Sequence, residues 1–333
     1  MCGIAGYFGK KYFSEKKIYN ILDIMKSRGP NFQDYFRFKN KKGLNINLFS
    51  SRLSIIDLNS KSNQPFIIEN FVMVYNGEIY NYLELRKKLE LKGVKFYTKS
   101  DTEVVLRYFM LYGKKCLDYF EGMWSLVIYN KKTNKIFISR DRFGEKPLHI
   151  LKTNDGFYFG SEINYIKNLY SEKIEINKKH LLNYLTLGYK SLYKYEENFF
   201  KNIKQIPHSS YIYSNINENF KIKKFWKLNL KQDNKINLKD AIKSTKEKVI
   251  ESIGLRLRSD VPVALCLSGG IDSSIIAAVA IKIFNKKVKT FSIIDADSRY
   301  SEQKNILRNI KDLKCEHEFI QPTFIIDYRL LII

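Results

Sequence analysis

The stretch SGGIDSS, residues 268–274, joins an apolar run to a helical pattern in the last third of the chain. The apolar run predicts a buried strand, since strands of parallel sheets are covered on both faces. Strands and helices alternate from there to residue 320. The expected elements are an amphipathic helix at 238–257, a strand at 261–267, a helix at 272–284, a strand at 288–294, a helix at 302–313 and a strand at 316–320. This βαβαβ order predicts the start of an α/β doubly wound parallel sheet.

The composition of this loop favours phosphate binding. Gly269 and Gly270 allow close approach of the backbone and a positive φ, and a helix start presents free N–H groups to an anion. The loop lacks the lysine of the GxxxxGK[ST] motif, so it does not grip β- and γ-phosphates as a P-loop does. A plain strand-to-helix turn with a serine cap is the alternative. The complete SGGxDS pattern after a buried strand predicts a nucleotide site.

Residues 1–165 have a different pattern, with short strands separated by turns and interrupted by two helices. The expected strands cover 44–49, 71–75, 125–129, 136–140 and 157–160, and the expected helices cover 82–91 and 102–112. Asn81 is a suitable N-cap for the first of these helices. Runs of strands with helices between them indicate an α+β layered domain. The pattern from 166 to 236 is weak and rich in Tyr and Lys, and we interpret it as a connecting region.

Cys2 is a candidate nucleophile. Removal of Met1 would leave it as the first residue, with its own α-amino group beside the thiol. An α-amino group, whose ordinary pKa is about 7.7–8.0, can act as the base that a nucleophile otherwise borrows from histidine. The four histidines stand at positions 149, 180, 208 and 317, so a local Cys-His pair is not expected. Taken alone, an isolated cysteine in a first strand is more simply a small buried residue.

A cysteine that attacks an amide also needs an oxyanion hole and groups that hold the substrate. The side chain of Asn76 and the N–H of Gly77 are suited to stabilise a tetrahedral intermediate. Arg52 can bind a carboxylate in a bidentate manner, and Glu78 or Asp101 can bind an ammonium group. Taken singly, Asn76-Gly77 also fits a hairpin turn, and Asp101 fits a helix N-cap.

Together these segments resemble the glutamine-hydrolysing asparagine synthetases, which belong to the glutamine amidotransferases with an N-terminal cysteine. The resemblance is carried by MCGIAGYFG (1–9), RGP (28–30), SRLSIIDL (51–58), YNGEIYNYLELR (75–86), SDTE (100–103), FEGMWSLVIYN (120–130), RDRFGEKPL (140–148) and SGGIDSS (268–274). It runs in order from residue 2 to about 320. It implies an α+β N-terminal-nucleophile sandwich (αββα) over 1–228 and a partial ATP-pyrophosphatase domain of the SGGxDS type over 229–333.

The resemblance also implies roles for individual residues. Cys2 would form a glutamyl thioester and release ammonia, with Asn76 and Gly77 as oxyanion donors. The glutamine site would consist of Arg52, Ile55, Asn76, Gly77, Glu78 and Asp101; the ATP site would consist of Leu267, Ser268, Gly269, Gly270, Asp272, Ser273 and Ile293, with Asp272 also a ligand of Mg²⁺. The ammonia would pass to an adenylated aspartate, giving asparagine, AMP and pyrophosphate.

The charge of the chain is strongly positive, at +24 from 58 Lys and Arg against 34 Asp and Glu. The lysines come in scattered pairs rather than blocks, which indicates solvated surface and not nucleic-acid binding. No segment reaches the roughly 18 apolar residues of a membrane span, and the first residues lack a secretory signal pattern. Four cysteines are too few for a disulfide scaffold. We expect a cytoplasmic protein with small-molecule substrates, no nucleic-acid or membrane partner, and a fold compatible with a homodimer.

The end of the chain departs from the family pattern. Family members continue beyond the position of Ile333 with a further acidic and glycine-rich segment and most of the acceptor site, so we expect an incomplete synthetase half from a truncated or frameshifted gene product. Two alternatives remain open: an amidotransferase for another carboxylate, such as a sugar acid, and a product that is only a glutaminase. A basic protein that binds nucleic acid is a third class, which predicts steeply salt-dependent binding.

Overall fold

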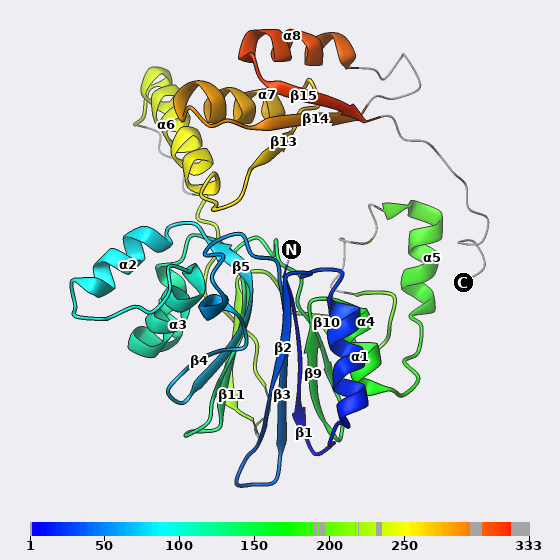
Figure 1. Cartoon of the computed structure of the whole chain (residues 1–333). Helices are drawn as coiled ribbons and strands as arrows, with labels where there is room; N and C mark the ends of the chain where they lie inside the picture. Colours follow the sequence, from blue (N-terminus) through cyan, green and yellow to red (C-terminus); the bar gives the residue numbers. More distant parts are fainter. Residues whose placement is uncertain are drawn as a thin grey trace. The chain divides into compact units, whose positions relative to one another are not determined.

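The computed structural model describes residues 2–189, 192, 197–216, 218, 220–230, 235–293 and 302–320 (Figure 1). The chain divides into two compact units, Met1–Leu230 and Lys231–Ile333. This division is close to the boundary expected after residue 228. Among the described helices, none is long and apolar enough to cross a membrane.

The described part of the first unit contains two antiparallel sheets of six strands each. One has the strand order β10-β8-β9-β1-β3-β2 and consists of β1 (Gly3–Gly9), β2 (Phe32–Lys39), β3 (Asn45–Arg52), β8 (His149–Lys152), β9 (Gly156–Gly160) and β10 (Ile203–Gln205). The other has the order β12-β11-β7-β6-β5-β4 and consists of β4 (Phe66–Ile68), β5 (Phe71–Ile79), β6 (Gly122–Asn130), β7 (Lys135–Arg140), β11 (Ser210–Asn215) and β12 (Lys223–Lys224).

Helices cover the outer faces of these sheets. Because side chains alternate between the two faces of a strand, one set of apolar residues fills the space between the sheets and two other sets face outward. The first sheet packs against α1 (Glu15–Met25) and α4 (Ile163–Tyr170), and the second against α2 (Tyr82–Glu90) and α3 (Asp101–Tyr112). The layers therefore run helix, sheet, sheet, helix (Figure 1), which confirms the expected αββα sandwich.

The expected strands and helices of residues 1–165 are confirmed, most of them with longer ends. The hairpin interpretation of Asn76-Gly77 is wrong, because both residues lie inside β5. The N-cap of α3 is Ser100, whose side chain accepts from the Thr102 N–H, so Asp101 stands in the first turn instead. Asn81 precedes α2 as expected but makes no side-chain cap, since its amide binds the backbone of residues 119 and 121.

The interpretation of 166–236 as a connecting region is wrong. This segment contributes α5 (Lys178–Leu187) and the strands β10, β11 and β12. β11 pairs with β7 over its whole length, and β10 pairs with β8, so both sheets depend on the segment. The strands are short and lie at or near the sheet edges, where outward side chains such as Tyr213 remain exposed. Their apolar periodicity is weak for this reason.

The second unit has the expected βαβαβ order. Its parallel sheet has the order β13-β14-β15, formed by β13 (Ala264–Cys266), β14 (Lys289–Ile293) and β15 (Glu316–Ile320). The helices are α6 (Leu238–Arg256), α7 (Ile271–Ala278), which continues as a π-helical turn at Val279–Ile283, and α8 (Gln303–Leu313). The expected strand at 261–267 is confirmed only over Ala264–Cys266, in its second half.

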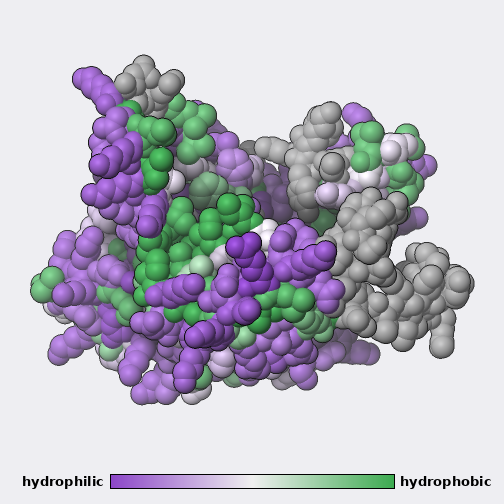
Figure 2. Space-filling view, turned by 90° about the horizontal axis from the view of Figure 1, so that it is seen from above, coloured by the Kyte–Doolittle hydropathy of each residue, from purple (hydrophilic) through white to green (hydrophobic). Residues whose placement is uncertain are grey.

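Burial in the second unit is sparse within the described residues. Its core cluster consists of Leu267, Ala277, Ile306 and Leu313. Helix α6 buries none of its side chains, and Ile242 is 61% exposed. β13 is an edge strand of the described sheet and exposes Ala264, so the expectation of a fully buried strand is wrong. Among the exposed hydrophobic residues of this unit are Leu238, Ile271 and Leu307. Figure 2 shows hydrophobic residues in green on the face of the molecule seen from above, bordered by hydrophilic residues.

Candidate active site around Cys2

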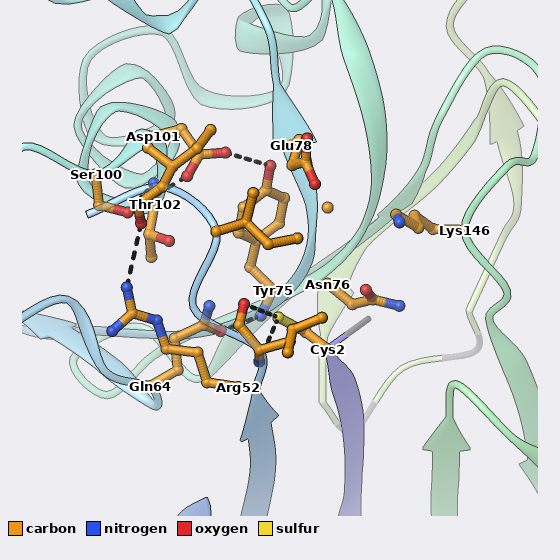
Figure 3. Close-up of a pocket in the computed structure, with 14 residues that line it drawn as sticks. Cys2, Arg52, Gln64, Tyr75, Asn76, Glu78, Ser100, Asp101, Thr102 and Lys146 are labelled. Atoms are coloured by element: carbon orange, nitrogen blue, oxygen red, sulfur yellow. Dashed lines mark hydrogen bonds between the residues drawn. The ribbon is translucent and has the colours of Figure 1, made fainter. Parts of the chain in front are cut away.

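One pocket of the first unit gathers all the residues expected to bind or cleave glutamine (Figure 3). The expected residues in its wall are Cys2, Arg52, Ile55, Asn76, Gly77, Glu78 and Asp101. They come from the start of β1, the end of β3 and its following loop, β5, and the first turn of α3. The sheets thus bring together residues up to about a hundred positions apart in sequence.

The Cys2 thiol is held by the backbone of Leu53. The Leu53 N–H donates to Sγ at 3.3 Å, and the thiol donates to the Leu53 carbonyl at 3.6 Å. Burial raises the pKa of the Cys2 thiol, while the backbone hydrogen bond of Leu53 acts to lower it. Met1 lies outside the described residues, so the proposed role of the α-amino group stays a prediction.

Strand β5 presents Asn76, Gly77 and Glu78 to the pocket. Asn76 is buried, and within the described residues neither its amide nitrogen nor its amide oxygen has a hydrogen-bond partner. N–H groups alternate along an antiparallel strand, so the orientation of Gly77 follows from its neighbours. The N–H groups of Tyr75 and Ile79 bind the side chains of Gln64 and Asp101, on the side away from β6.

The N–H of Gly77 therefore also faces away from β6, on the pocket side of the strand. Gly77 is required sterically as well. A Cβ there would lie 2.3 Å from the Met123 carbonyl oxygen and 2.8 Å from the Trp124 Cα. The buried Asn76 amide without a partner and the neighbouring Gly77 N–H are two donors suited to one oxyanion.

Two carboxylates lie in the same pocket. Asp101 is buried and accepts from the Tyr75 hydroxyl at 2.9 Å and from the Ile79 N–H at 3.0 Å. Burial raises the pKa of Asp101, and these hydrogen bonds act against the rise. Burial also raises the pKa of Glu78, and the charge of Asp101 adds to the rise. The pair forms an acidic wall suited to a cation.

Arg52 lies in the pocket wall with its guanidinium bound to its own loop. Nη1 donates to the Asn59 carbonyl at 3.1 Å and to Asn63 Oδ1 at 2.8 Å, and Nη2 donates to the carbonyls of Ile56 and Asp57. Burial lowers the pKa of Arg52. The guanidinium thus fixes the loop after β3, which also supplies the Leu53 contact to Cys2.

Sequence reasoning missed half of the pocket wall. The residues without an expected role are Leu53, Ile56, Gln64, Tyr75, Ser100, Thr102 and Lys146. All of them except Gln64 stand inside segments that carried the family resemblance, and this was the available signal. Their place in the pocket depends on contacts between distant segments, which a local pattern does not encode.

The SGGIDSS loop of the second unit follows the carboxyl end of β13 and leads into α7. Gly269 has a φ of +83°, which favours glycine. Ser268 and Ser273 bind each other through their hydroxyls at 3.1 Å, and the Gly270 N–H donates to Ser268 Oγ at 3.3 Å. N-cap Gly270 has no side-chain cap, so the first N–H groups of α7 have no side-chain acceptor there.

The other residues expected around ATP differ in their exposure to solvent. Ile293 is 69% exposed, whereas Leu267 is buried in the small core with its N–H bound to the Phe291 carbonyl. The structure therefore does not bring the Leu267 side chain to the exposed edge with Ile293. Asp272 is exposed in the first turn of α7, and the described residues contain no cluster of three metal-ligating side chains.

Two protein families match the chain, one over most of the first unit and one within the second unit. Residues 1–226 match the glutamine amidotransferase domain family. The chain belongs to this family. Residues 244–324 of this amidotransferase match the asparagine synthase family. Asparagine synthetase [glutamine-hydrolyzing] 1 of Bacillus subtilis is 33% identical over 91% of the chain and 47% of its own length. Putative asparagine synthetase [glutamine-hydrolyzing] 2 of Methanocaldococcus jannaschii is 35% identical over 95% of the chain and 64% of its own length.

The amidotransferase chain thus spans about half to two thirds of these relatives. Among solved structures, the glutamine phosphoribosylpyrophosphate amidotransferase of B. subtilis is similar, with a TM-score of 0.50 and 15% identity over 100% of the chain and 70% of its own length. An allosteric regulatory enzyme of purine biosynthesis has a TM-score of 0.52 at 13% identity, covering 96% of the chain and 80% of its own length. At these identities the likeness supports the fold alone.

Proposed function

We propose that this protein hydrolyses glutamine at Cys2 and uses the ammonia for ATP-dependent amide formation on a carboxylate, with aspartate as the acceptor. The observation that carries the proposal is the pocket in which Cys2, the Asn76-Gly77 pair and two carboxylates meet. The match of residues 244–324 to the asparagine synthase family supports the second step.

In the first step the Cys2 sulfur attacks the carboxamide carbon of glutamine. The Asn76 amide and the Gly77 N–H stabilise the negative charge on the carbonyl oxygen. The C–N bond breaks, the former thiol proton goes to the leaving nitrogen, and ammonia leaves behind a thioester. Water then cleaves the thioester to glutamate and restores the thiol.

The remaining residues of the pocket hold the substrate. Glu78 and Asp101 bind the α-ammonium group of glutamine, and Arg52 binds its α-carboxylate. The Arg52 guanidinium exchanges part of its loop contacts for the substrate carboxylate, so binding and the order of the loop are coupled. The backbone at Ile55 completes this side of the pocket.

The second unit fits a nucleotide site in its loop. Gly269, with its positive φ, and the uncapped start of α7 are suited to an anion, with Ser268, Gly270 and Ser273 beside them. Asp272 offers one carboxylate, which suits Mg²⁺ because this ion commonly takes one or two carboxylates together with phosphate oxygens. When bound, Mg²⁺ would neutralise the charge of the phosphates, and ATP would supply the adenylyl group that activates the acceptor carboxylate. Ile293, and Leu267 through its main chain, would border the adenine.

The thiol chemistry is compatible with a reducing compartment, and we infer a cytoplasmic protein that works on small molecules. The test of the function is the release of ammonia and AMP from the purified protein with glutamine, ATP, Mg²⁺ and aspartate, each omitted in turn. AMP that forms only with aspartate supports the full proposal. Ammonia without AMP restricts the function to a glutaminase, AMP with another carboxylate changes the acceptor, and neither product overturns the proposal.

A further inference from the structure

Lys146 is the one cation in the wall of the Cys2 pocket besides Arg52, among the residues that the structure describes. It belongs to the loop after β7. This loop is fixed by two buried charged groups at the end of the strand. The Asp141 carboxylate accepts from the N–H groups of Phe143, Glu145 and Lys146 at 2.9–3.0 Å. The Arg140 guanidinium donates to the Lys146 carbonyl at 2.7 Å and to the Ile206 carbonyl at 2.7 Å.

The backbone of Lys146 is therefore held on both sides, and its side chain extends into the pocket (Figure 3). Only 5% of Lys146 is exposed. Within the described part of the chain, its ammonium group has no hydrogen-bond or ion-pair partner, although a buried lysine is normally paired. A buried ammonium group that lies in a pocket wall without a partner is suited to stabilise a negative charge in that pocket.

Lys146 shares the pocket wall with the carboxylate of Glu78 and the thiol of Cys2. Burial lowers the pKa of Lys146, and the charge of Glu78 acts against this fall. The effect is mutual. Burial and the charge of Asp101 raise the pKa of Glu78, and Lys146 lowers it. Without a nearby cation, two buried carboxylates in one pocket would share a proton.

We propose that Lys146 is a positioning residue that keeps Glu78 ionised, so that Glu78 can bind the ammonium group of an α-amino acid substrate. This proposal rests on the proposed glutamine hydrolysis at Cys2. In the empty pocket, Lys146 is the counter-charge of the acidic wall. When the substrate enters, its own ammonium group joins Lys146 at Glu78. Lys146 touches neither the scissile amide nor the attacking sulfur in this role.

The proposal predicts a particular dependence on pH. The titratable groups that line the pocket with Glu78 are Asp101 of α3, Lys146 of the loop after β7, Cys2 at the residue before β1, Tyr75 of β5 and Arg52 of β3. A protonated Glu78 no longer attracts an ammonium group, so the KM for glutamine rises as the pH falls through the pKa of Glu78. Removal of Lys146 raises that pKa further, so the rise in KM begins at a higher pH.

The experiment compares the full-length protein with Lys146→Met and Lys146→Arg by ammonia release from glutamine between pH 5 and pH 9. For a shift of one pKa unit, the KM of Lys146→Met exceeds that of the original protein about tenfold in the acid range and approaches it in the alkaline range. The value of kcat stays within about twofold, and Lys146→Arg restores the profile. Lys99→Met, at an exposed lysine before α3, is the matched control and leaves the profile unchanged.

Glu78→Gln isolates the mechanism. The part of the acid rise in KM that comes from Glu78 disappears in this variant, Asp101 keeps its own part, and adding Lys146→Met then moves nothing further. A uniform rise in KM at every pH, or the same shift in the Glu78→Gln background, overturns the proposal. A fall in kcat with an altered pH dependence of Cys2 alkylation assigns Lys146 to the thiol and also overturns it. If the original protein releases no ammonia from glutamine, the proposed function fails. If it does and Lys146→Met keeps the profile, only the role of Lys146 fails.

Discussion

The two units differ most in how they use their apolar residues. In the first unit, buried side chains fill three layers around two sheets, and the pocket lies where the ends of β1, β3 and β5 meet. In the second unit, four buried residues form the core cluster of the described part, and the apolar side chains of α6 are exposed or only half-buried. Both units carry a family motif. The comparison teaches that a motif and a completed core are separate properties of a sequence.

The largest expected effect concerns the pocket of the first unit. Cys2→Ala removes the nucleophile, so the rate of glutamine hydrolysis falls by at least about 10³-fold, as expected for loss of a covalent catalyst. ATP binding by the second unit is unchanged. Initial rates of ammonia release and the affinity for ATP measure the two properties separately. A Cys2→Ala protein that loses both would break the division of roles between the units.

A matched pair of core substitutions tests the difference in packing. Leu126 is fully buried on β6, and Leu126→Ala lowers the free energy of unfolding of the first unit by about 2–5 kcal/mol. Ile242 on α6 is 61% exposed, and Ile242→Ala changes stability by less than about 0.5 kcal/mol. Both tryptophans of the chain, Trp124 and Trp226, lie in the first unit, so urea denaturation followed by their fluorescence measures the effect of Leu126→Ala. Urea-dependent hydrogen exchange of the backbone amides of α6 measures the effect of Ile242→Ala in the second unit.

Equal shifts of the denaturation midpoint for the two variants would contradict the contrast in packing. A loss of about 2 kcal/mol for Ile242→Ala would mean that α6 is covered in solution.

A smaller effect is expected at the nucleotide loop. Asp272→Asn removes the exposed carboxylate of α7, and the affinity for ATP with Mg²⁺ falls at least about tenfold, the size of a lost interaction with a charged group. Glutamine hydrolysis keeps its rate. Calorimetric titration with ATP in the presence and absence of Mg²⁺ measures the change. An Asp272→Asn protein with unchanged Mg²⁺-dependent affinity would remove this residue from the metal site.

Much of the fold is predictable from local pattern, and the failures have physical causes. β5 is recognised from its continuous run of apolar residues, Phe71 to Tyr75, and the βαβαβ order from strands and helices in turn. The strands β10 and β11 escape recognition because they are short and complete sheets whose other strands lie far away in sequence. The periodicity of α6 predicts an apolar face, but a face is buried only where a partner covers it.

The residues of the site divide in the same way, into those that residue type predicts and those that only contacts between distant segments reveal. The nucleophile, the Asn76-Gly77 pair and the carboxylates can be proposed from residue types, because each chemistry needs particular groups. Lys146 cannot, since its place in the pocket depends on the hydrogen bonds of Arg140 and Asp141 that turn its loop inward. The loop contacts of Arg52 are likewise visible only in three dimensions.

The central claim is that Cys2 is the nucleophile of a glutamine site within the first unit. The most direct test is to treat the full-length protein with a glutamine analogue that carries an electrophilic carbon at the carboxamide position, and to locate the label by peptide mass spectrometry. The account predicts one label per chain, on Cys2 and not on Cys116, Cys266 or Cys315, with protection by glutamine and no effect of ATP. A label on another cysteine, or labelling of Cys2 that glutamine does not suppress, would contradict it.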